Sequence, residues 1–193
     1  MDAANTSVSA LRQTLRAKRR ALSATEQNSL ASLLCHQVLH RLDFNCAPQN
    51  IACYLSFDGE ISAQPLMAAL KNRQHFIYLP ILTGSKIRFV RDSQHRYLNR
   101  FGIAEPHHQK TQHANKMDVV FVPLVAFDKH SRRLGMGGGF YDRSFAFKHT
   151  HSTPTLYGLA FDFQCVKCLQ VNAWDVPLDG VFTPSRFYNR PPV

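Results

Sequence analysis

The sequence of 193 residues contains no apolar run near the length of about 20 residues that a membrane-spanning helix needs. Its five cysteines are an odd number in a chain that is not small, which argues against a disulfide framework. Nine glycines and ten prolines are scattered, which excludes collagen-like and low-complexity classes. Residues 1–9 are polar and hold no apolar signal core, so we expect a cytoplasmic protein that does not bind membranes.

Acidic residues are also scarce near the amino terminus, and this leaves a second interpretation open. Residues 3–25 contain five basic residues and no acidic one, a composition typical of a mitochondrial transit peptide. The segment runs without a break into the next helical pattern. This continuity favours the other interpretation, an ordinary basic first helix of the domain.

The whole chain has 13 acidic residues against 23 Lys and Arg, a formal charge of +10. Such a charge implies an anionic partner: nucleic acid, membrane headgroups or a polyanionic small molecule. Composition does not choose among these. The apolar content of 45% fits a globular protein, and the length favours one domain spanning residues 1–193.

Hydrophobic periodicity predicts helices that alternate with buried strands. A Ser23–Glu26 capping box marks the start of a second helix. Residues 92–117 are polar and without clear period, so we expect a long functional loop there. The class is α/β, a single three-layer domain with a mostly parallel, mixed central sheet between helices. The expected helices span residues 8–22, 24–42, 62–73, 144–148 and 162–170, and the expected strands 51–57, 76–80, 86–91, 119–123, 155–160 and 180–183.

The strongest chemical signal is a glycine-rich segment that follows a buried strand and precedes a short helix. Gly135 and residues 137–139 supply four glycines in five positions. Backbone N–H groups there can approach an anion without obstruction by Cβ atoms. The segment is neither a Walker A loop nor a dinucleotide fingerprint, because both spacings fail. Neighbouring arginines and Asp142 would suit phosphate and a metal ion.

Three segments of the sequence form a specific pattern. The central one is DVVFVPLVAFD at 118–128 with RLGMGGGFYDR at 133–143. The others are YLSFDGEI at 54–61 and WDVPLDGVFTP at 174–184. These segments resemble the 5-formyltetrahydrofolate cyclo-ligase family, also called 5,10-methenyltetrahydrofolate synthetases. Together with the Leu11-Arg12 pair of the first helix, the resemblance covers nearly the whole chain.

The resemblance implies an ATP- and Mg²⁺-dependent ligase of one-carbon metabolism. Such an enzyme converts 5-formyltetrahydrofolate, with or without a polyglutamyl tail, to 5,10-methenyltetrahydrofolate and releases ADP and phosphate. The γ-phosphoryl group of ATP activates the formyl oxygen, and N10 of the folate then closes the ring. Both ATP and the glutamyl part of folate are anions, which would explain the basic charge without nucleic acid. We expect a monomer.

The resemblance also implies roles for individual residues. Asp142, Arg133 and Tyr141 would be catalytic, and Asp142 with Asp179 would hold Mg²⁺. The implied ATP ligands are Arg12, Arg133, Leu134, Gly135, Met136, Gly137, Gly138, Gly139, Phe140, Tyr141 and Arg143. The implied folate ligands are Leu55, Glu60, Met136, Gly137, Gly138, Gly139, Phe140 and Trp174.

Two positions depart from the family pattern, because Val8 and Gly138 stand where many relatives carry a lysine. Both lysines would face phosphate, so other cations must take their place. Arg143, Lys18 and Arg16 are the candidates that the sequence offers. For Trp174 a packing role and a place beside the folate remain equal alternatives.

Two other functions stay open at this stage. One is an RNA-binding module that uses the basic first helix, where Arg12, Arg16 and Arg20 recur every four residues. The other is a different nucleotide-dependent transferase on a similar scaffold, which would not need the folate segment. The pair Cys165 and Cys168 has no second pair at zinc-site spacing, so packing within a helix is the preferred interpretation.

Overall fold

The computed structural model describes residues 8–93, 95–99, 102, 104–106, 110–170 and 172–191. Its α-helices are α1 (Val8–Ala21), α2 (Ala24–Arg41), α3 (Gln64–Asn72) and α4 (Phe140–Phe145). Short 3₁₀ helices follow at η1 (Ala114–Lys116), η2 (Ala146–His149) and η3 (Asp162–Gln164). The strands are β1 (Asn50–Ala52), β2 (Phe76–Thr83), β3 (Lys86–Arg91), β4 (Arg96–Leu98), β5 (Ala104–Pro106), β6 (Val119–Pro123), β7 (Ala126–Asp128), β8 (Arg133–Leu134), β9 (Thr155–Leu159), β10 (Cys165–Val166), β11 (Gly180–Phe182) and β12 (Phe187–Asn189).

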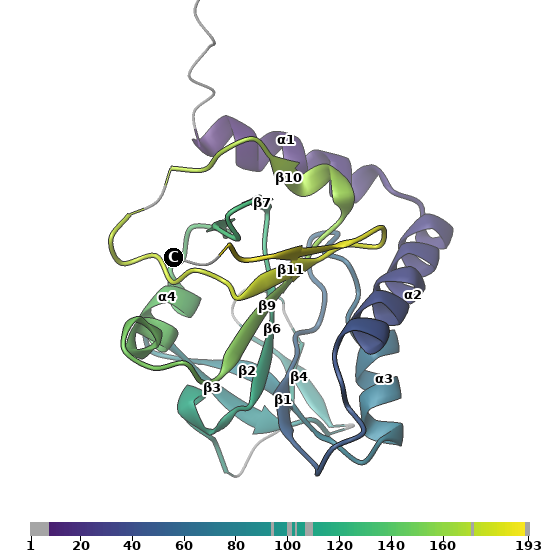
Figure 1. Cartoon of the computed structure of the whole chain (residues 1–193), viewed down its shortest axis with the longest axis vertical. Helices are drawn as coiled ribbons and strands as arrows, with labels where there is room; N and C mark the ends of the chain where they lie inside the picture. Colours follow the sequence, from purple (N-terminus) through teal and green to yellow (C-terminus); the bar gives the residue numbers. More distant parts are fainter. Residues whose placement is uncertain are drawn as a thin grey trace, which may run out of the picture.

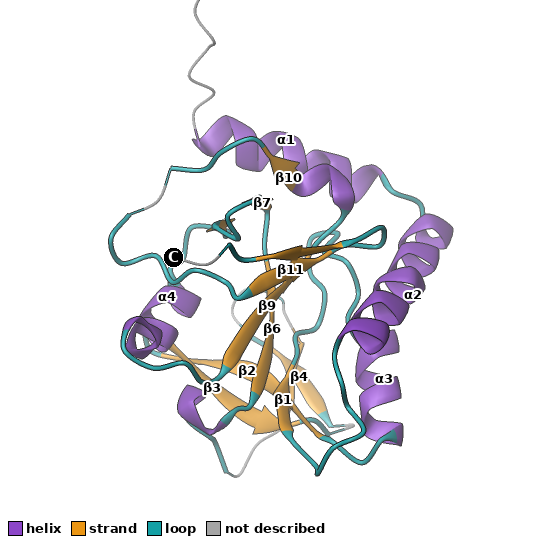
Figure 2. Cartoon of the chain, viewed as in Figure 1, coloured by secondary structure: helices purple, strands orange, loops and turns teal. Residues whose placement is uncertain are grey.

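Seven strands form the central sheet in the order β12-β11-β9-β6-β1-β2-β3. The five strands from β11 to β2 are mutually parallel, and the edge strands β3 and β12 run antiparallel to their neighbours. Helices α2 and α3 cover one face and α4 lies on the other side (Figures 1 and 2). The predicted fold class, α/β with a mostly parallel mixed sheet between helices, is confirmed.

Helix α2 forms as its sequence predicts and supplies much of one core face. The Ser23 hydroxyl accepts a hydrogen bond from the Glu26 N–H, and the Glu26 side chain accepts one from the Ser23 N–H, which completes the capping box. Leu34 and Val38 are fully buried against α3 and the sheet. No helix in the described ranges has the length and apolarity to cross a membrane.

Helix α1 lies across the carboxyl ends of the central strands (Figure 1). Its apolar side packs Leu15 against Val125 and Ala126, which follow strand β6. Its buried Arg19 donates a hydrogen bond to the Leu124 carbonyl at 3.1 Å. Ligands of parallel α/β sheets bind outside this end of the strands, so α1 borders the expected site.

Several predicted elements differ from the structure. The strand at 51–57 ends at Ala52, because the chain leaves the sheet toward a turn at Asp58. The helix predicted at 162–170 is wrong: only Asp162–Gln164 is 3₁₀, and the next residues pair with β7. The helix predicted at 144–148 begins at Phe140 and continues as the 3₁₀ helix η2 from Ala146. The predicted loop at 92–117 contains the β4–β5 pair and η1.

A buried carboxylate holds the turn that leads into the glycine-rich loop. Asp128 is 0% exposed and accepts hydrogen bonds from the N–H groups of His130 and Arg132 at 2.9 and 3.2 Å. Its second oxygen accepts from the Leu169 N–H at 3.0 Å. One side chain therefore ties the β7–β8 turn to the segment after β10.

We expect Asp128→Ala to lower the free energy of unfolding by about 3 kcal/mol or more, because it leaves buried N–H donors without acceptors. Urea denaturation measures the loss. Asp43→Ala is the matched control, since Asp43 accepts from the Asn45 N–H on the exposed surface, and its expected change is about 0.5 kcal/mol or less. Equal losses in the two variants would show that Asp128 has no special structural role.

Candidate functional site

The glycine-rich loop, residues 135–139, joins strand β8 to helix α4. Gly137 and Gly139 have φ angles of 98° and 61°, in the left-handed region that glycine adopts without strain. A Cβ on Gly138 would lie 2.7 Å from the Phe140 ring, and one on Gly139 would lie 2.6 Å from an Arg143 nitrogen. A side chain at either position would therefore require Phe140 or Arg143 to move.

A cavity of about 600 Å³, the polar cavity, lies between this loop and helix α1. Arg12 enters from α1 and donates a hydrogen bond from Nε to the Gly135 carbonyl at 2.9 Å. Arginines and glycine N–H groups at one wall are the donors that phosphate groups bind. The charged residues that line it are Arg12, Arg133, Arg143, Asp142 and Asp175.

Asp142 and Arg133 form an ion pair within the polar cavity. The Arg133 Nη2 lies 2.6 Å from Asp142 Oδ1, which also accepts the Val176 N–H at 3.2 Å. The Arg133 guanidinium lies 5.7 Å from the Tyr141 ring centroid. Asp142 lies in the first turn of α4, whose N-cap is Gly139, so Asp142 does not cap this helix.

A second cavity of about 640 Å³, the apolar cavity, lies on the other side of the loop. Its walls are aliphatic and aromatic, and among the described residues its charged lining consists of two carboxylates, Glu60 and Glu105. Such a cavity suits a flat heterocycle that carries N–H donors. The residues predicted to bind folate that line it are Leu55, Glu60, Met136, Gly137, Gly138 and Phe140.

Glu60 is held at the inner wall of the apolar cavity. One carboxylate oxygen accepts the Phe57 N–H at 3.1 Å, and the other lies 3.9 Å from Arg19 Nη1. Burial raises the pKa of Glu60 to about 7, against the lowering effect of the Phe57 hydrogen bond and Arg19. Helix α3 has no side-chain cap, so a capping role for Glu60 is excluded.

Gly137 lines both cavities, so the loop forms a wall that they share. Leu134, Gly135 and Gly139 line the polar cavity. Of the residues predicted to contact ATP, Met136, Gly138, Phe140 and Tyr141 line the apolar cavity instead. The backbone alternates between the two sides, because successive residues of the loop point in different directions.

Trp174 and Asp179 occupy other places than the resemblance suggested. Trp174 is 68% exposed and lines the polar cavity, so it is neither a packing anchor nor part of the apolar cavity. Asp179 does not line either cavity. Its carboxylate accepts the Leu156 N–H at 2.7 Å and pairs with Lys148 at 3.1 Å, which fixes the start of β9.

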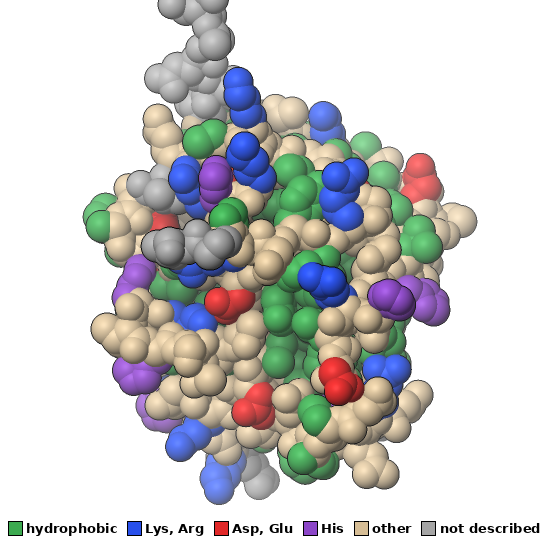
Figure 3. All heavy atoms as spheres, in the orientation of Figure 1, with side chains coloured by type: hydrophobic (Ala, Val, Ile, Leu, Met, Phe, Trp, Pro, Cys, Tyr) green, Lys and Arg blue, Asp and Glu red, His purple; other side chains and the backbone are tan. Residues whose placement is uncertain are grey.

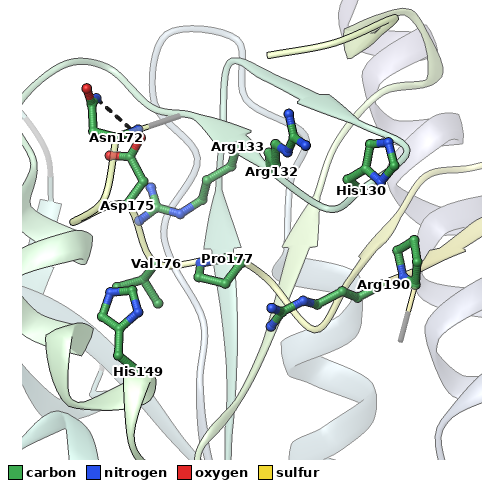
Figure 4. A pocket seen from close by; sticks show the side chains of 10 residues that line it. His130, Arg132, Arg133, His149, Asn172, Asp175, Val176, Pro177 and Arg190 are labelled. Atoms are coloured by element: carbon green, nitrogen blue, oxygen red, sulfur yellow. Dashed lines mark hydrogen bonds between the residues drawn. The ribbon is translucent and has the colours of Figure 1, made fainter. Parts of the chain in front are cut away.

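Asp175 is the acidic residue that sequence reasoning missed. It lines the polar cavity together with Asp142, and its Oδ2 accepts the Asn172 N–H at 2.8 Å. Figure 4 shows Asp175 and Asn172 to the left of Arg133 in an adjoining basic cleft, with His149 below them. Asp175 follows Trp174 in the segment at 174–184, which resembles the family. Its place in that segment was the signal in the sequence that could have identified it.

Glu105 is a second residue that the sequence did not reveal. It is 4% exposed at the edge of the apolar cavity, on strand β5. Its carboxylate accepts hydrogen bonds from the Leu82 N–H, the Tyr97 hydroxyl and the Asn99 amide at 3.2, 2.9 and 2.8 Å. These bonds dock the β4–β5 pair against β2 and form one wall of the cavity.

Comparison with known proteins agrees with this geometry. Residues 4–184 match the 5-formyltetrahydrofolate cyclo-ligase family. The chain is 35% identical over 182 residues to the 5-formyltetrahydrofolate cyclo-ligase of Escherichia coli K12, covering 90% of this chain and 98% of that protein. It is 38% identical over 176 residues to the Haemophilus influenzae enzyme of the same name, covering 87% and 92%.

Solved structures extend the likeness to the fold. The 5,10-methenyltetrahydrofolate synthetase of Aquifex aeolicus superposes with a TM-score of 0.81 at 28% identity, covering 96% of this chain and 94% of that one. The synthetase of Mycoplasma pneumoniae gives 0.73 at 26% identity, covering 92% and 98%. Sequence and structure agree that the chain belongs to the 5-formyltetrahydrofolate cyclo-ligase family.

Proposed function

We propose that this chain converts 5-formyltetrahydrofolate to 5,10-methenyltetrahydrofolate, with ATP in the polar cavity and the folate in the apolar cavity. The observation that carries the proposal is the shared wall at Gly137. Two cavities of opposite character share this residue, which carries no side chain of its own. A reaction that transfers a phosphoryl group between two substrates needs this arrangement.

The formyl oxygen of the substrate is a poor leaving group, so the reaction must activate it before the ring closes. The formyl oxygen attacks the γ-phosphorus of ATP, an O–P bond forms, and the bond to ADP breaks. N10 then attacks the activated formyl carbon and loses its proton, while the C–O bond breaks and inorganic phosphate leaves. The protein supplies positioning and charge rather than a nucleophile. Arg12 and Arg143 would hold phosphate oxygens, and Glu60 would accept N–H bonds from the pterin.

The polar cavity also contains donors that fit Mg²⁺. Asp142 and Asp175 both line it, and two carboxylates completed by phosphate oxygens and water are ordinary Mg²⁺ chemistry. No three His, Cys, Asp or Glu side chains gather as a ligand set in the part of the chain described here, so the nucleotide itself would complete the site. Bound Mg²⁺ would neutralise phosphate charge. We assign it to Asp142 and Asp175, with Asp175 replacing Asp179.

The RNA-binding alternative loses support from the same geometry. Arg12 turns inward to the glycine-rich loop, and Arg16 and Arg20 pair with Asp58 at 2.6 and 3.4 Å. On the face in Figure 3, several Lys and Arg side chains lie at the α1 end of the molecule, where the polar cavity is built. A basic stripe that is engaged by the protein itself is a poor surface for RNA.

The direct test mixes the protein with MgATP and 5-formyltetrahydrofolate and follows the absorbance of methenyltetrahydrofolate. We expect the signal to rise only when all components are present, with one ADP formed per product. A signal without ATP, or ADP formation that is independent of the folate, would contradict the proposal.

We expect Glu60→Gln to raise the KM for the folate by about tenfold to a hundredfold, because a charge-assisted hydrogen bond is worth about 1.5–3 kcal/mol. The KM for ATP should change less than twofold. In the wild type, the folate KM should rise as pH falls through about 7, where the Glu60 carboxylate takes up a proton. The variant should lack this dependence.

The same pKa has a consequence for stability that serves as a control. Because the pKa of Glu60 is raised from 4.5 to about 7 in the folded protein, its contribution to the unfolding free energy falls as pH rises from 4.5 through 7. Glu60→Gln should flatten this part of the stability curve. Unchanged folate kinetics in a variant with the flattened curve would restrict Glu60 to a structural role.

We expect Arg12→Ala to raise the KM for ATP about tenfold or more, because Arg12 lines the polar cavity and would bind phosphate oxygens there. The folate KM should stay within twofold, because Arg12 does not line the apolar cavity. Initial rates across an ATP series measure the change. Arg20→Ala is the matched control, because it removes a cation of the same helix that points away from the cavity. Similar ATP curves for both variants would refute the phosphate contact.

For the metal site, we expect Asp142→Asn and Asp175→Asn each to reduce turnover at limiting Mg²⁺ by about a hundredfold, with partial recovery at high Mg²⁺. Asp179→Asn is the discriminating comparison, because its carboxylate lies outside the polar cavity. Turnover across a Mg²⁺ series, with folding checked by circular dichroism, measures the effect. A Mg²⁺ dependence confined to Asp142→Asn and Asp179→Asn would restore Asp179 as the ligand.

A further inference from the structure

Helix α1 places a fully buried cation behind the apolar cavity. Arg19 is 0% exposed; its Nη1 donates to the Leu124 carbonyl at 3.1 Å and its Nη2 to Asp58 Oδ2 at 3.0 Å. Its Nε is buried and has no hydrogen-bond partner among the described residues. A buried guanidinium is costly unless anions balance it, so the surrounding carboxylates decide why it is there.

Two carboxylates, Asp58 and Glu60, lie within 4 Å of Arg19, and they differ in the number of cations that pair with each. Asp58 pairs with Arg16 and Arg20 as well as Arg19, so it would keep two cationic partners if Arg19 were replaced. Among described residues, Glu60 has Arg19 as its one cation within this distance, at 3.9 Å from Nη1. Replacing Arg19 would therefore leave Asp58 paired and Glu60 without a counter-charge.

We infer that Arg19 is a positioning residue that keeps Glu60 ionised and directed into the apolar cavity. The inference rests on the proposed contact between Glu60 and the folate. The Phe57 N–H donates to one oxygen of Glu60 at 3.1 Å and Arg19 Nη1 lies 3.9 Å from the other, so each oxygen has a neighbour that favours its negative charge. Arg19 reaches it from α1, which also carries Arg12 into the polar cavity.

The other titratable groups that face Glu60 do not favour its ionised form. Asp58, two residues away on the same turn, raises the pKa of Glu60 by charge repulsion. Tyr54, in the chain after β1, and Tyr141, in α4, also face Glu60. Burial raises the pKa of both hydroxyls, and the negative charge of Glu60 raises it further, so both hydroxyls stay neutral. Arg19 is the one charged side chain in this group that opposes protonation.

The experiment measures the folate KM from pH 5.5 to 9.5 in Arg19→Met, which replaces the cation by an apolar chain of similar length. We expect the pH midpoint of folate binding to rise by about one unit or more, since an opposite charge within 4–6 Å shifts a carboxyl by about 1–3 units. At pH 7 the folate KM should rise about fivefold or more, because a midpoint one unit higher lowers the ionised fraction of Glu60 from about a half to about a tenth. It should recover most of the difference at pH 9.5, where Glu60 ionises without help. The ATP KM should stay within twofold.

Two other variants act as matched controls. Arg20→Ala removes a cation from the same cluster that touches Asp58 and does not approach Glu60, so the midpoint should not move. Arg19→Lys keeps the charge and should hold the midpoint within about half a unit of the wild type. Arg19→Lys also keeps the inference testable should Arg19→Met fail to fold.

The double variant Arg19→Met/Glu60→Gln separates the inference from the proposed function. Once Glu60 is replaced, we expect loss of Arg19 to have little further effect on the folate KM. A lower melting temperature with an unmoved midpoint in Arg19→Met, or a midpoint shift in Arg19→Lys equal to that in Arg19→Met, would overturn the role of Arg19 alone. An unchanged folate KM in Glu60→Gln itself would instead overturn the folate contact and the inference with it.

Discussion

The ion pair between buried Arg19 and Asp58 is the interaction that docks helix α1 beside both cavities. A guanidinium without exposure must keep its anion, so α1 can dock in one register only. The turn that supplies this anion is shaped for the contact: Asp58 has a φ of 52°, and a Cβ on Gly59 would lie 3.0 Å from the Arg19 backbone. Two helical turns earlier, the same helix places Arg12 over the glycine-rich loop.

The wall between the cavities solves a geometric problem of the reaction. A formyl oxygen in an apolar site must reach a phosphorus atom in a charged site, and any intervening side chain would keep the two apart. Gly137 lines both sites and has a φ of 98°, a conformation that side-chain-bearing residues rarely adopt.

Several arginines near the site are paired with carboxylates of the same chain. Arg16 and Arg20 bind Asp58, and the hydrogen bonds from Arg16 and Arg19 lower the pKa of that carboxyl although burial opposes them. Arg133 binds Asp142 in the polar cavity. Part of the net charge of +10 therefore stabilises the fold through ion pairs. Arg12 and Arg143, which line the polar cavity, would bind the phosphates of ATP under the proposed function.

The sequence alone predicted the parts of the site that local chemistry determines. The four loop glycines follow from the need for backbone without Cβ atoms, and the capping box follows from the pattern Ser23 to Glu26. The buried strand at 119–123 was predicted with the observed bounds, because a run of β-branched and aromatic residues suits a strand covered on both faces. The family resemblance located Glu60, Arg12 and Asp142.

Tertiary structure decided which of several equivalent residues face the site. Asp175 and Asp179 lie four residues apart in an irregular segment without periodicity, and only folding turned Asp175 toward the polar cavity while Asp179 bound Lys148. Arg19 looked like one more basic residue of α1, because its burial arises from contact with a turn 39 positions away. Helix amphipathicity is a local pattern, whereas the pairing of a buried charge depends on residues distant in sequence.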